Sequence, residues 1–143
     1  LDPHQLSEEL RKSVEITLDL IDEETVARLI NELGRSEQVP TGQFYTFKPH
    51  TFVLAQMLER FALPNDIAGR IEGRSTFARL GISVHQTAHS VKPTWSGHLT
   101  LEMYNTGPFA CKLYPELQRP AQLILERMGR PVHRPDQSRW ENR

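Results

Sequence analysis

The sequence is poor in the residues that cross-link small proteins or carry a chain into a membrane. Its 143 residues include one cysteine, Cys111, which excludes an intrachain disulfide and a cysteine-rich zinc site. No apolar run approaches the roughly 18–20 residues that a membrane-spanning helix needs. Charge of one sign is also lacking, because 17 Lys and Arg oppose 18 Asp and Glu. A chain without a basic excess is poorly suited to duplex DNA, so we expect no DNA binding. The missing apolar run argues against a membrane protein. The single cysteine fits a reducing compartment, and we therefore expect a cytoplasmic protein.

The length and composition are those of one globular domain covering residues 1–143. A chain of this size buries roughly two thirds of its unfolded surface, so its core needs no covalent or metal support. Hydrophobic residues make up 38% of the chain and charged residues 24%, which is ordinary for a globular protein. Because the chain starts at Leu1 instead of methionine, we expect some N-terminal sequence to be missing. Residues 127–143 carry five arginines and two acids, and such a basic C-terminal tail is typically solvated.

The periodicity of the apolar residues predicts mostly short strands. Residues 14–20 alternate apolar and polar side chains, which predicts a half-buried strand. Helical spacing follows between Asp22, a suitable N-cap, and Gly34, a typical helix end. Six further strands are predicted, at residues 44–47, 52–56, 67–71, 98–104, 111–114 and 121–125. Turn-forming residues separate them, and this pattern favours an all-β fold, closed or double-sheeted, with one or two short helices.

Residues 73–81 combine glycine, hydroxyl and guanidinium groups in one short stretch, which reads Gly-Arg-Ser-Thr-Phe-Ala-Arg-Leu-Gly. Two hydroxyls between Arg74 and Arg79 form a compact set of donors for phosphate oxygens. Taken alone, the same residues also fit a capped helical turn with exposed arginines, because Ser and Thr are common at helix starts. The residues themselves leave both interpretations open.

An acid lies near the middle of the strand predicted at residues 98–104. The alternation places Glu102 on one face of that strand together with Thr100 and Tyr104. If this face meets solvent, the acid is unremarkable. If it borders a cleft, the carboxyl group is suited to moving protons. The strand alone is compatible with both placements.

The histidines do not form a recognised metal-binding pattern. His85 and His89 are four residues apart, but their neighbours are typical of loops and strands, and no HExxH sequence is present. We therefore predict no metal site. Trp95 lies between turn residues and is expected to plug the core beneath a turn. Cys111 is expected to be a small buried apolar residue.

Three segments carry a more specific pattern when they are taken together. They read GRSTFARLG, VHQTAHSVKPTWSGHLTLEMYNTG and LYPELQRPAQLILERM, in that order. In this order they resemble the dCTP deaminase branch of the dCTP deaminase and trimeric dUTPase superfamily, from about Gln43 to Met128. The resemblance implies a distorted jelly-roll-like β-barrel of the dUTPase-like type. It also implies a homotrimer whose active sites lie at subunit boundaries.

The resemblance assigns roles to the residues that match the family pattern. Arg74 and Thr76 would hold phosphate oxygens of the nucleotide. Ser75 and Arg79 would position the catalytic water and the carboxylate, reaching across from a neighbouring subunit. Glu102 falls on the family's catalytic glutamate and would serve as general acid and base.

The implied reaction is hydrolytic deamination of dCTP to dUTP and ammonia without zinc. The backbone at Ala88, Thr100 and Leu101 would hold the pyrimidine. Glu102 would take a proton from water, and the resulting hydroxide would attack C4 of cytosine. The same carboxyl group would then deliver protons to N3 and to the departing ammonia. Mg²⁺ would serve only the triphosphate, bridging its oxygens.

The sequence departs from the family pattern at Ser90 and Lys92, where the family has Arg and Asp. That Asp meets the deoxyribose 3′-hydroxyl and, in dUTPase relatives, orients the attacking water. A lysine accepts no hydrogen bond, so we expect no dUTP hydrolysis of the dUTPase kind. Lys92 would lie near the sugar or the phosphates of a nucleotide. Alternatively, it points into solvent, as most lysines do.

Two further departures concern the C-terminal part of the chain. The family's Pro-Gly turn is replaced by a longer turn at Pro115–Gln118, and Arg139 lies in a weak echo of the family's C-terminal lid. These departures keep two alternatives to a dCTP deaminase open. One is a non-catalytic or regulatory nucleotide-binding domain of the same fold, and the other is a related nucleotide hydrolase with an altered substrate.

Overall fold

The computed structural model describes residues 28, 31, 34 and 36–133 of the chain. Contacts divide the chain into two units, residues 1–38 and 39–143, and every described strand belongs to the second unit. The strand predicted at residues 14–20 lies outside the described residues. Of the helix predicted after Asp22, Arg28 and Asn31 are described, and both are helical.

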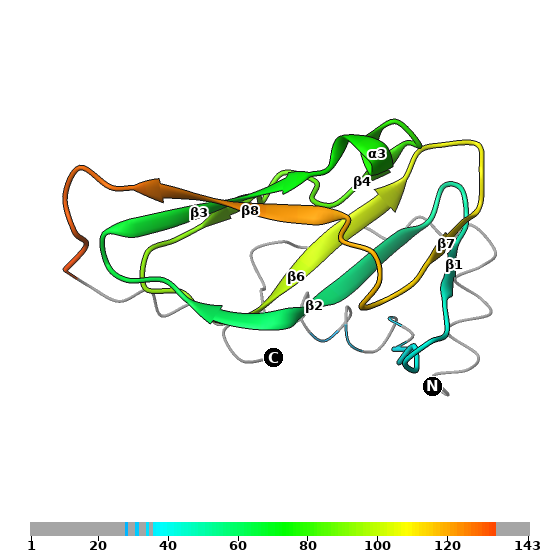
Figure 1. Cartoon of the computed structure of the whole chain (residues 1–143), viewed down its shortest axis with the longest axis horizontal. Helices are drawn as coiled ribbons and strands as arrows, with labels where there is room; N and C mark the ends of the chain where they lie inside the picture. The colour runs from blue at the N-terminus through cyan, green and yellow to red at the C-terminus, as the bar shows by residue number, and fades with distance from the viewer. Residues whose placement is uncertain (1–27, 29–30, 32–33, 35, 134–143) are drawn as a thin grey trace. The chain divides into compact units, whose positions relative to one another are not determined.

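The described residues form eight strands and one short helix of the second unit (Figure 1). In chain order these are β1 (Tyr45–Phe47), β2 (Phe52–Ala62), β3 (Ile67–Gly73), α3 (Ser75–Ala78), β4 (Ile82–Ser83), β5 (Ser90–Val91), β6 (Ser96–Asn105), β7 (Cys111–Leu113) and β8 (Ala121–Arg127). All six strands predicted from residue 44 onward are present, which confirms the all-β prediction. The sequence did not reveal β4 and β5, because two residues are too few to display an alternation. No helix in the described part of the chain is long and apolar enough to span a membrane.

The strands pair into three antiparallel sheets, with the orders β1-β7, β2-β6-β4 and β5-β3-β8. The longest pairing joins β2 and β6, and its register shifts between Gln56 and Arg60. Figure 1 shows β3 and β8 running together along one layer, with β2 and β6 in the other. Two stacked antiparallel layers are the arrangement of a jelly-roll-like fold, in agreement with the prediction.

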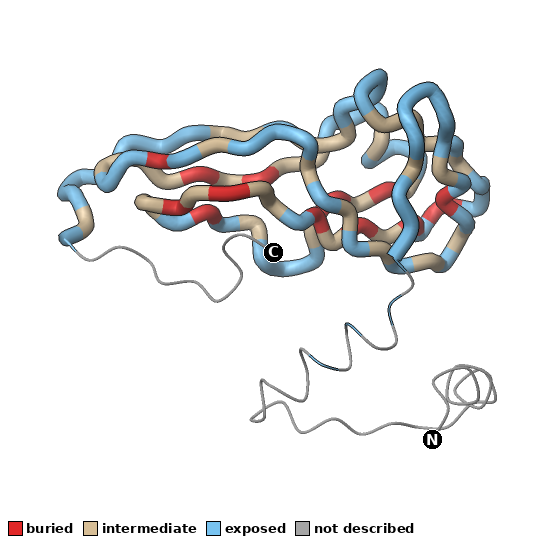
Figure 2. The backbone as a smooth tube through the Cα atoms, turned by 90° about the horizontal axis from the view of Figure 1, so that it is seen from below, coloured by how far each residue is buried: buried red, intermediate tan, exposed pale blue. Residues whose placement is uncertain are grey.

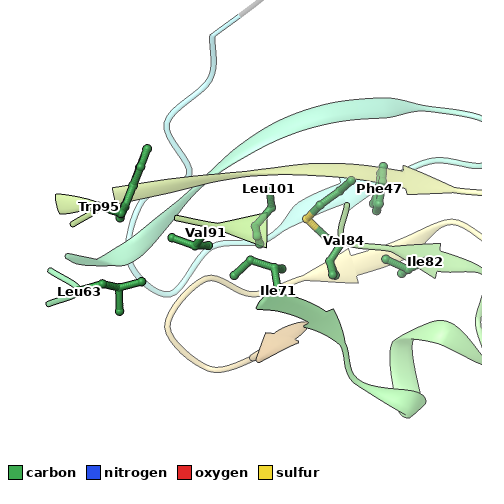
Figure 3. Packing of buried hydrophobic residues seen from close by; sticks show 9 residues of the cluster. Phe47, Leu63, Ile71, Ile82, Val84, Val91, Trp95 and Leu101 are labelled. Carbon is green, nitrogen blue, oxygen red and sulfur yellow. The ribbon is translucent and has the colours of Figure 1, made fainter. Parts of the chain in front are cut away.

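The hydrophobic core is formed by the inward faces of both layers (Figures 2 and 3). Ile71 of β3 and Val91 of β5 belong to one buried cluster with Leu101 of β6. Trp95 is 9% exposed and joins this cluster, which confirms its predicted role as a plug. Cys111 is only partly buried and packs against the cluster from outside.

Asn105, at the end of β6, is a fully buried polar residue that ties three segments together. Its Nδ2 atom donates to the carbonyl oxygens of Phe47 at 3.0 Å and Phe109 at 2.9 Å. Its Oδ1 atom accepts from the backbone N–H of Gly107 at 3.0 Å. Because both amide protons and the oxygen are bonded, burying this side chain leaves no unsatisfied polar group.

Two glycines allow the turn after α3 to lie against the loop after β6. Gly81 adopts a φ of +84°, and its carbonyl oxygen accepts from both N–H and Oγ1 of Thr106, at 2.8 and 2.9 Å. A Cβ atom on Gly107 would collide with the carbonyl oxygen of Leu80. The backbones of the two loops are therefore in contact at a place where larger residues do not fit.

We predict that Gly107→Ala strongly destabilises the fold, because the added methyl group has no room beside the Leu80 carbonyl. The free energy of unfolding in urea should fall by roughly 3 kcal/mol or more, at the upper end of overpacking costs. Gly129→Ala is the matched control, since nothing lies within 4 Å of a Cβ atom there. Equal unfolding midpoints for the two variants would contradict the close approach of these loops.

Candidate active site

β6 presents an acid on the face of its sheet that points away from the core. Glu102 pairs with Leu54 of β2, and Thr100 pairs with Gln56. The alternate residue Leu101 is 6% exposed and faces the core. This register confirms that Glu102 and Thr100 share a face, as the alternation predicted.

The surroundings of Glu102 on this face are apolar and open. Glu102 itself is half-buried and Thr100 is exposed. On the neighbouring strand β2, Phe52 and Leu54 are each 50% exposed and Leu58 is 59% exposed. Large apolar side chains that remain this exposed beside a carboxyl group mark a surface suited to being covered by a partner.

The loop between β4 and β5, residues 84–89, lies against the outer edge of β6. The backbone N–H of Gln86 donates to Oε2 of Glu102 at 3.3 Å, and the Gln86 side chain donates to the backbone carbonyl of Glu102, also at 3.3 Å. Ala88 is exposed on this loop. The loop therefore brings Ala88 and Glu102 into one region of the surface.

The same edge of β6 carries free backbone positions next to the acid. β4 pairs with β6 only at Tyr104 and Asn105, and no described strand pairs with this edge at Thr100. The N–H and C=O of one strand residue point to the same edge, successive residues alternate between the edges, and the Glu102 carbonyl points to the loop edge. The N–H and C=O of Thr100 consequently lie on the loop edge, while those of Leu101 point toward β2.

α3 and its flanking residues display the predicted donors on the surface. Arg74, Ser75, Thr76 and Arg79 are all exposed. The helical turn with exposed arginines is present, but it has no side-chain cap: Arg74 is the N-cap residue, and no side-chain hydrogen bond caps the helix. None of the four side chains makes a hydrogen bond or ion pair within the described residues, so these donors are available to a ligand.

The position of α3 is fixed by its backbone instead of by a cap. The N–H of Arg74 donates to the carbonyl of Pro120 at 3.0 Å, and Phe77 packs against the core cluster. β4 follows α3 and pairs with the end of β6. No hydrogen bond or ion pair in the described part of the chain joins the α3 donors to Glu102. A single chain therefore offers the donors and the acid on separate elements.

Lys92 lies on the turn that joins β5 to β6. It is exposed, and its carbonyl oxygen accepts from the N–H of Trp95 at 3.2 Å. Thr94 has a φ of +69°, which together with Pro93 fits a type II turn that usually carries glycine at this position. Arg139 lies outside the described residues.

The histidines are placed near the site, but without the ligand set of a metal. The rings of His85 and His89 lie 5.4 Å apart between centroids, and Nδ1 of His98 lies 3.1 Å from the carbonyl oxygen of Met57. Across the residues that the structure describes, no group of three or more His, Cys, Asp or Glu side chains could hold a metal ion.

Sequence reasoning missed Gln86 and Asn105. Gln86 contacts Glu102 directly, whereas Asn105 fixes the end of the strand that carries Glu102. Both residues lie in the segment VHQTAHSVKPTWSGHLTLEMYNTG that carries the resemblance, but sequence reasoning assigned a role to neither. Their contacts join segments that only the tertiary fold brings together.

Comparisons with known proteins agree on one family. A family model described as dCTP deaminase-like matches residues 8–128. A protein of Methanobrevibacter smithii named "dCTP deaminase, dUMP-forming" is 40% identical over 118 residues, covering 82% of this chain and 58% of the relative. The dCTP deaminase of Shewanella oneidensis is 39% identical over 112 residues, covering 78% of this chain and 58% of that protein. The chain thus spans little more than half the length of these relatives.

The fold also resembles a solved structure. Native EIAV dUTPase superposes with a TM-score of 0.54 at 19% identity, covering 71% of this chain and 80% of that chain. At this identity the likeness shows a shared fold and leaves the chemistry to be argued from the site.

Proposed function

The chain belongs to the dCTP deaminase-like family, and from this premise we propose that it hydrolyses dCTP to dUTP and ammonia. The observation that carries the proposal is the exposure and hydrogen bonding of the residues that match the family pattern. Within the described residues, the side chains of the donors around α3 are exposed and make no hydrogen bond or ion pair, while Glu102 is held against the loop that carries Ala88. A fold that kept these residues only for stability would engage them in its own contacts. We also retain the prediction of a cytoplasmic enzyme that binds no DNA.

In the proposed mechanism Glu102 is the general acid and base. Its carboxylate takes a proton from a water molecule, and the hydroxide forms a bond to C4 of the cytosine ring. The carboxyl group returns that proton to N3, then transfers the second water proton to the amino group. The C4–N bond breaks, ammonia leaves and a C4 carbonyl remains. Backbone groups at Ala88 and at Thr100, on the loop edge of β6, hold the pyrimidine. The backbone of Leu101 points toward β2, so the predicted contribution of Leu101 to this contact is not part of the proposal.

The guanidinium and hydroxyl groups near α3 serve the triphosphate and the water. Arg74 and Thr76 donate to phosphate oxygens, and a planar guanidinium can engage two oxygens at once. Ser75 and Arg79 orient the water and the Glu102 carboxylate. Mg²⁺ would be held by the nucleotide, where it would offset the negative charge of the triphosphate.

A homotrimer would bring the two halves of the site together. The α3 donors do not contact Glu102 within one chain, so the proposed site takes them from a neighbouring copy. Phe52 and Leu54, half-exposed beside Glu102, supply apolar surface for that copy to cover. Each site would then lie at a subunit boundary.

The product assay tests the proposed activity. Incubating the chain with dCTP and Mg²⁺ should release equal amounts of ammonia and dUTP. Three relatives carry the name dUMP-forming, so dUMP must be resolved from dUTP by chromatography. Because Lys92 replaces the residue that orients water for dUTP hydrolysis, we expect dUTP to accumulate. Binding of dCTP without release of ammonia would favour a regulatory nucleotide-binding domain instead.

We predict that Glu102→Gln abolishes turnover while preserving the fold and dCTP binding. The amide has the same shape but cannot take a proton from water, and the rate should fall by roughly 10²–10⁴-fold. Glu126→Gln on β8 is the matched control and should retain the wild-type rate. Near-normal turnover by Glu102→Gln would remove Glu102 from the mechanism.

A second prediction follows from the proposed homotrimer. Light scattering measures its mass, and activity assays on diluted protein measure its dissociation. The mass in solution should be three times that of the chain, and specific activity should fall below the dissociation concentration of the trimer. Leu54→Glu should weaken assembly, because it places a charge on the surface to be covered. Leu117→Glu, at a residue that is 77% exposed on a turn, is the control. A monomer that turns over dCTP would refute the shared site.

A third prediction concerns Lys92. If Lys92 pairs with a phosphate or approaches the sugar, Lys92→Asp should weaken triphosphate binding by roughly 1.5–3 kcal/mol, the range for a hydrogen bond to a charged group. It should also alter recognition of the sugar, because an aspartate can accept a hydrogen bond from the 3′-hydroxyl and a lysine cannot. Calorimetry on dCTP, dUTP and CTP measures both effects, with Lys48→Asp as control. Unchanged affinities for all three would place Lys92 at the surface, away from the nucleotide.

A further inference from the structure

Gln86 stands out because it bonds to both the side chain and the backbone of Glu102. Its backbone N–H donates to Oε2 of Glu102 at 3.3 Å, and its side-chain Nε2 donates to the Glu102 carbonyl oxygen at 3.3 Å. The first of these is the only hydrogen bond that the described residues give to the Glu102 carboxylate. We propose that Gln86 is a positioning residue that holds this carboxylate in its productive orientation. This inference rests on the proposed function.

The Gln86 side chain is itself anchored to a rigid part of the fold. Its Nε2 atom donates to Oγ of Ser83 at 3.0 Å. Ser83 belongs to β4 and lies opposite Tyr104 of β6, and its hydroxyl donates to the Tyr104 carbonyl at 3.4 Å. The contacts form a closed set in which β4, the loop and β6 hold one another. We call Ser83, Gln86 and Glu102 the edge clamp.

The edge clamp matters because, among the described residues of its own chain, Glu102 has little else to orient it. The residue opposite on β2 is Leu54, which offers no hydrogen bond, and the carboxyl lies on an open face. A glutamate side chain has three rotatable bonds, and proton transfer depends on where its oxygens stand relative to water and base. If the side chain of Gln86 is removed, the loop loses its tie to β4 and β6. The N–H of residue 86 then no longer holds Oε2 in place.

Gln86→Met tests the clamp, since methionine keeps the length of the side chain and removes its N–H groups. With dCTP and Mg²⁺ we expect kcat to fall by about tenfold, as for a catalytic group displaced by a fraction of an ångström. KM and the calorimetric dissociation constant of dCTP should change by a smaller factor than kcat, because Gln86 contacts no donor assigned to the triphosphate and only the loop contact at Ala88 is loosened. Gln122→Met on β8 makes the same change at an exposed glutamine and should match the wild type.

The anchor provides a double-mutant cycle. Ser83→Ala removes the acceptor of Gln86 and should lower kcat in the same direction. Combining it with Gln86→Met should cause little further loss, because both changes break one set of contacts. Losses that multiply would contradict the clamp, as would a kcat of Gln86→Met within about twofold of the wild type.

A measurement without turnover separates failure of the clamp from failure of the proposed function. The side-chain carboxyl carbon of Glu102, assigned in NMR spectra by comparison with Glu102→Gln, should shift in Gln86→Met and not in Gln122→Met. If the wild type releases no ammonia from dCTP, the proposed function fails. The comparison of the Glu102 carboxyl resonances then tests by itself whether Gln86 holds the carboxylate. An unmoved carboxyl resonance in Gln86→Met would overturn the clamp whatever the activity.

Discussion

The buried amide of Asn105 is the constraint on which the rest of the site depends. It stands where β6 ends, and it bonds to the segments that precede β2 and follow β6. The adjacent close contact between Gly107 and the Leu80 carbonyl fixes the turn after α3 to the same point. The donors of α3 and the acid of β6 are therefore held at set positions on one framework, although they do not touch.

This framework explains why the α3 donors can be exposed and still be ordered. A Ser or Thr that capped the helix would use its hydroxyl internally. Here the backbone of Arg74 is anchored to Pro120 and Phe77 packs on the core, so the helix needs no cap. The hydroxyl and guanidinium groups are consequently left for a ligand. Glu102 differs, because a loop residue already bonds to its carboxylate and limits the positions that it can take.

Much of the fold was legible in the sequence, and the exceptions have physical reasons. The alternation around Glu102 predicted its strand and its face, because a period of two is unambiguous in a ten-residue strand. The sequence did not predict β4 and β5, since a strand of two residues is too short to show an alternation of apolar and polar side chains. The sequence left open whether Ser75 and Thr76 cap a helix or bind a ligand, because both roles use the same hydroxyl groups. Gln86 could not be predicted, since its contacts depend on how a loop folds against a strand edge.

The turns show how the chain departs locally from a family pattern without losing the fold. The longer turn after Tyr114 is closed by the N–H of Gln118 on the Tyr114 carbonyl at 3.1 Å, and Glu116 adopts a φ of +69°. Thr94 takes a similar φ beside Lys92, where a β-branched residue costs conformational energy. At both turns a residue other than glycine, Thr94 or Glu116, thus adopts a backbone geometry that favours glycine.

Subunit complementation tests the central claim most directly, that the acid and the α3 donors act together from different copies of the chain. Glu102→Gln and Arg79→Ala chains are purified separately and then as a co-expressed mixture, and ammonia release from dCTP is measured for each. The account predicts two inactive parents and a mixture with about one quarter of the wild-type rate, the share of sites with both groups intact in randomly mixed trimers. A mixture as inactive as its parents would contradict the shared site.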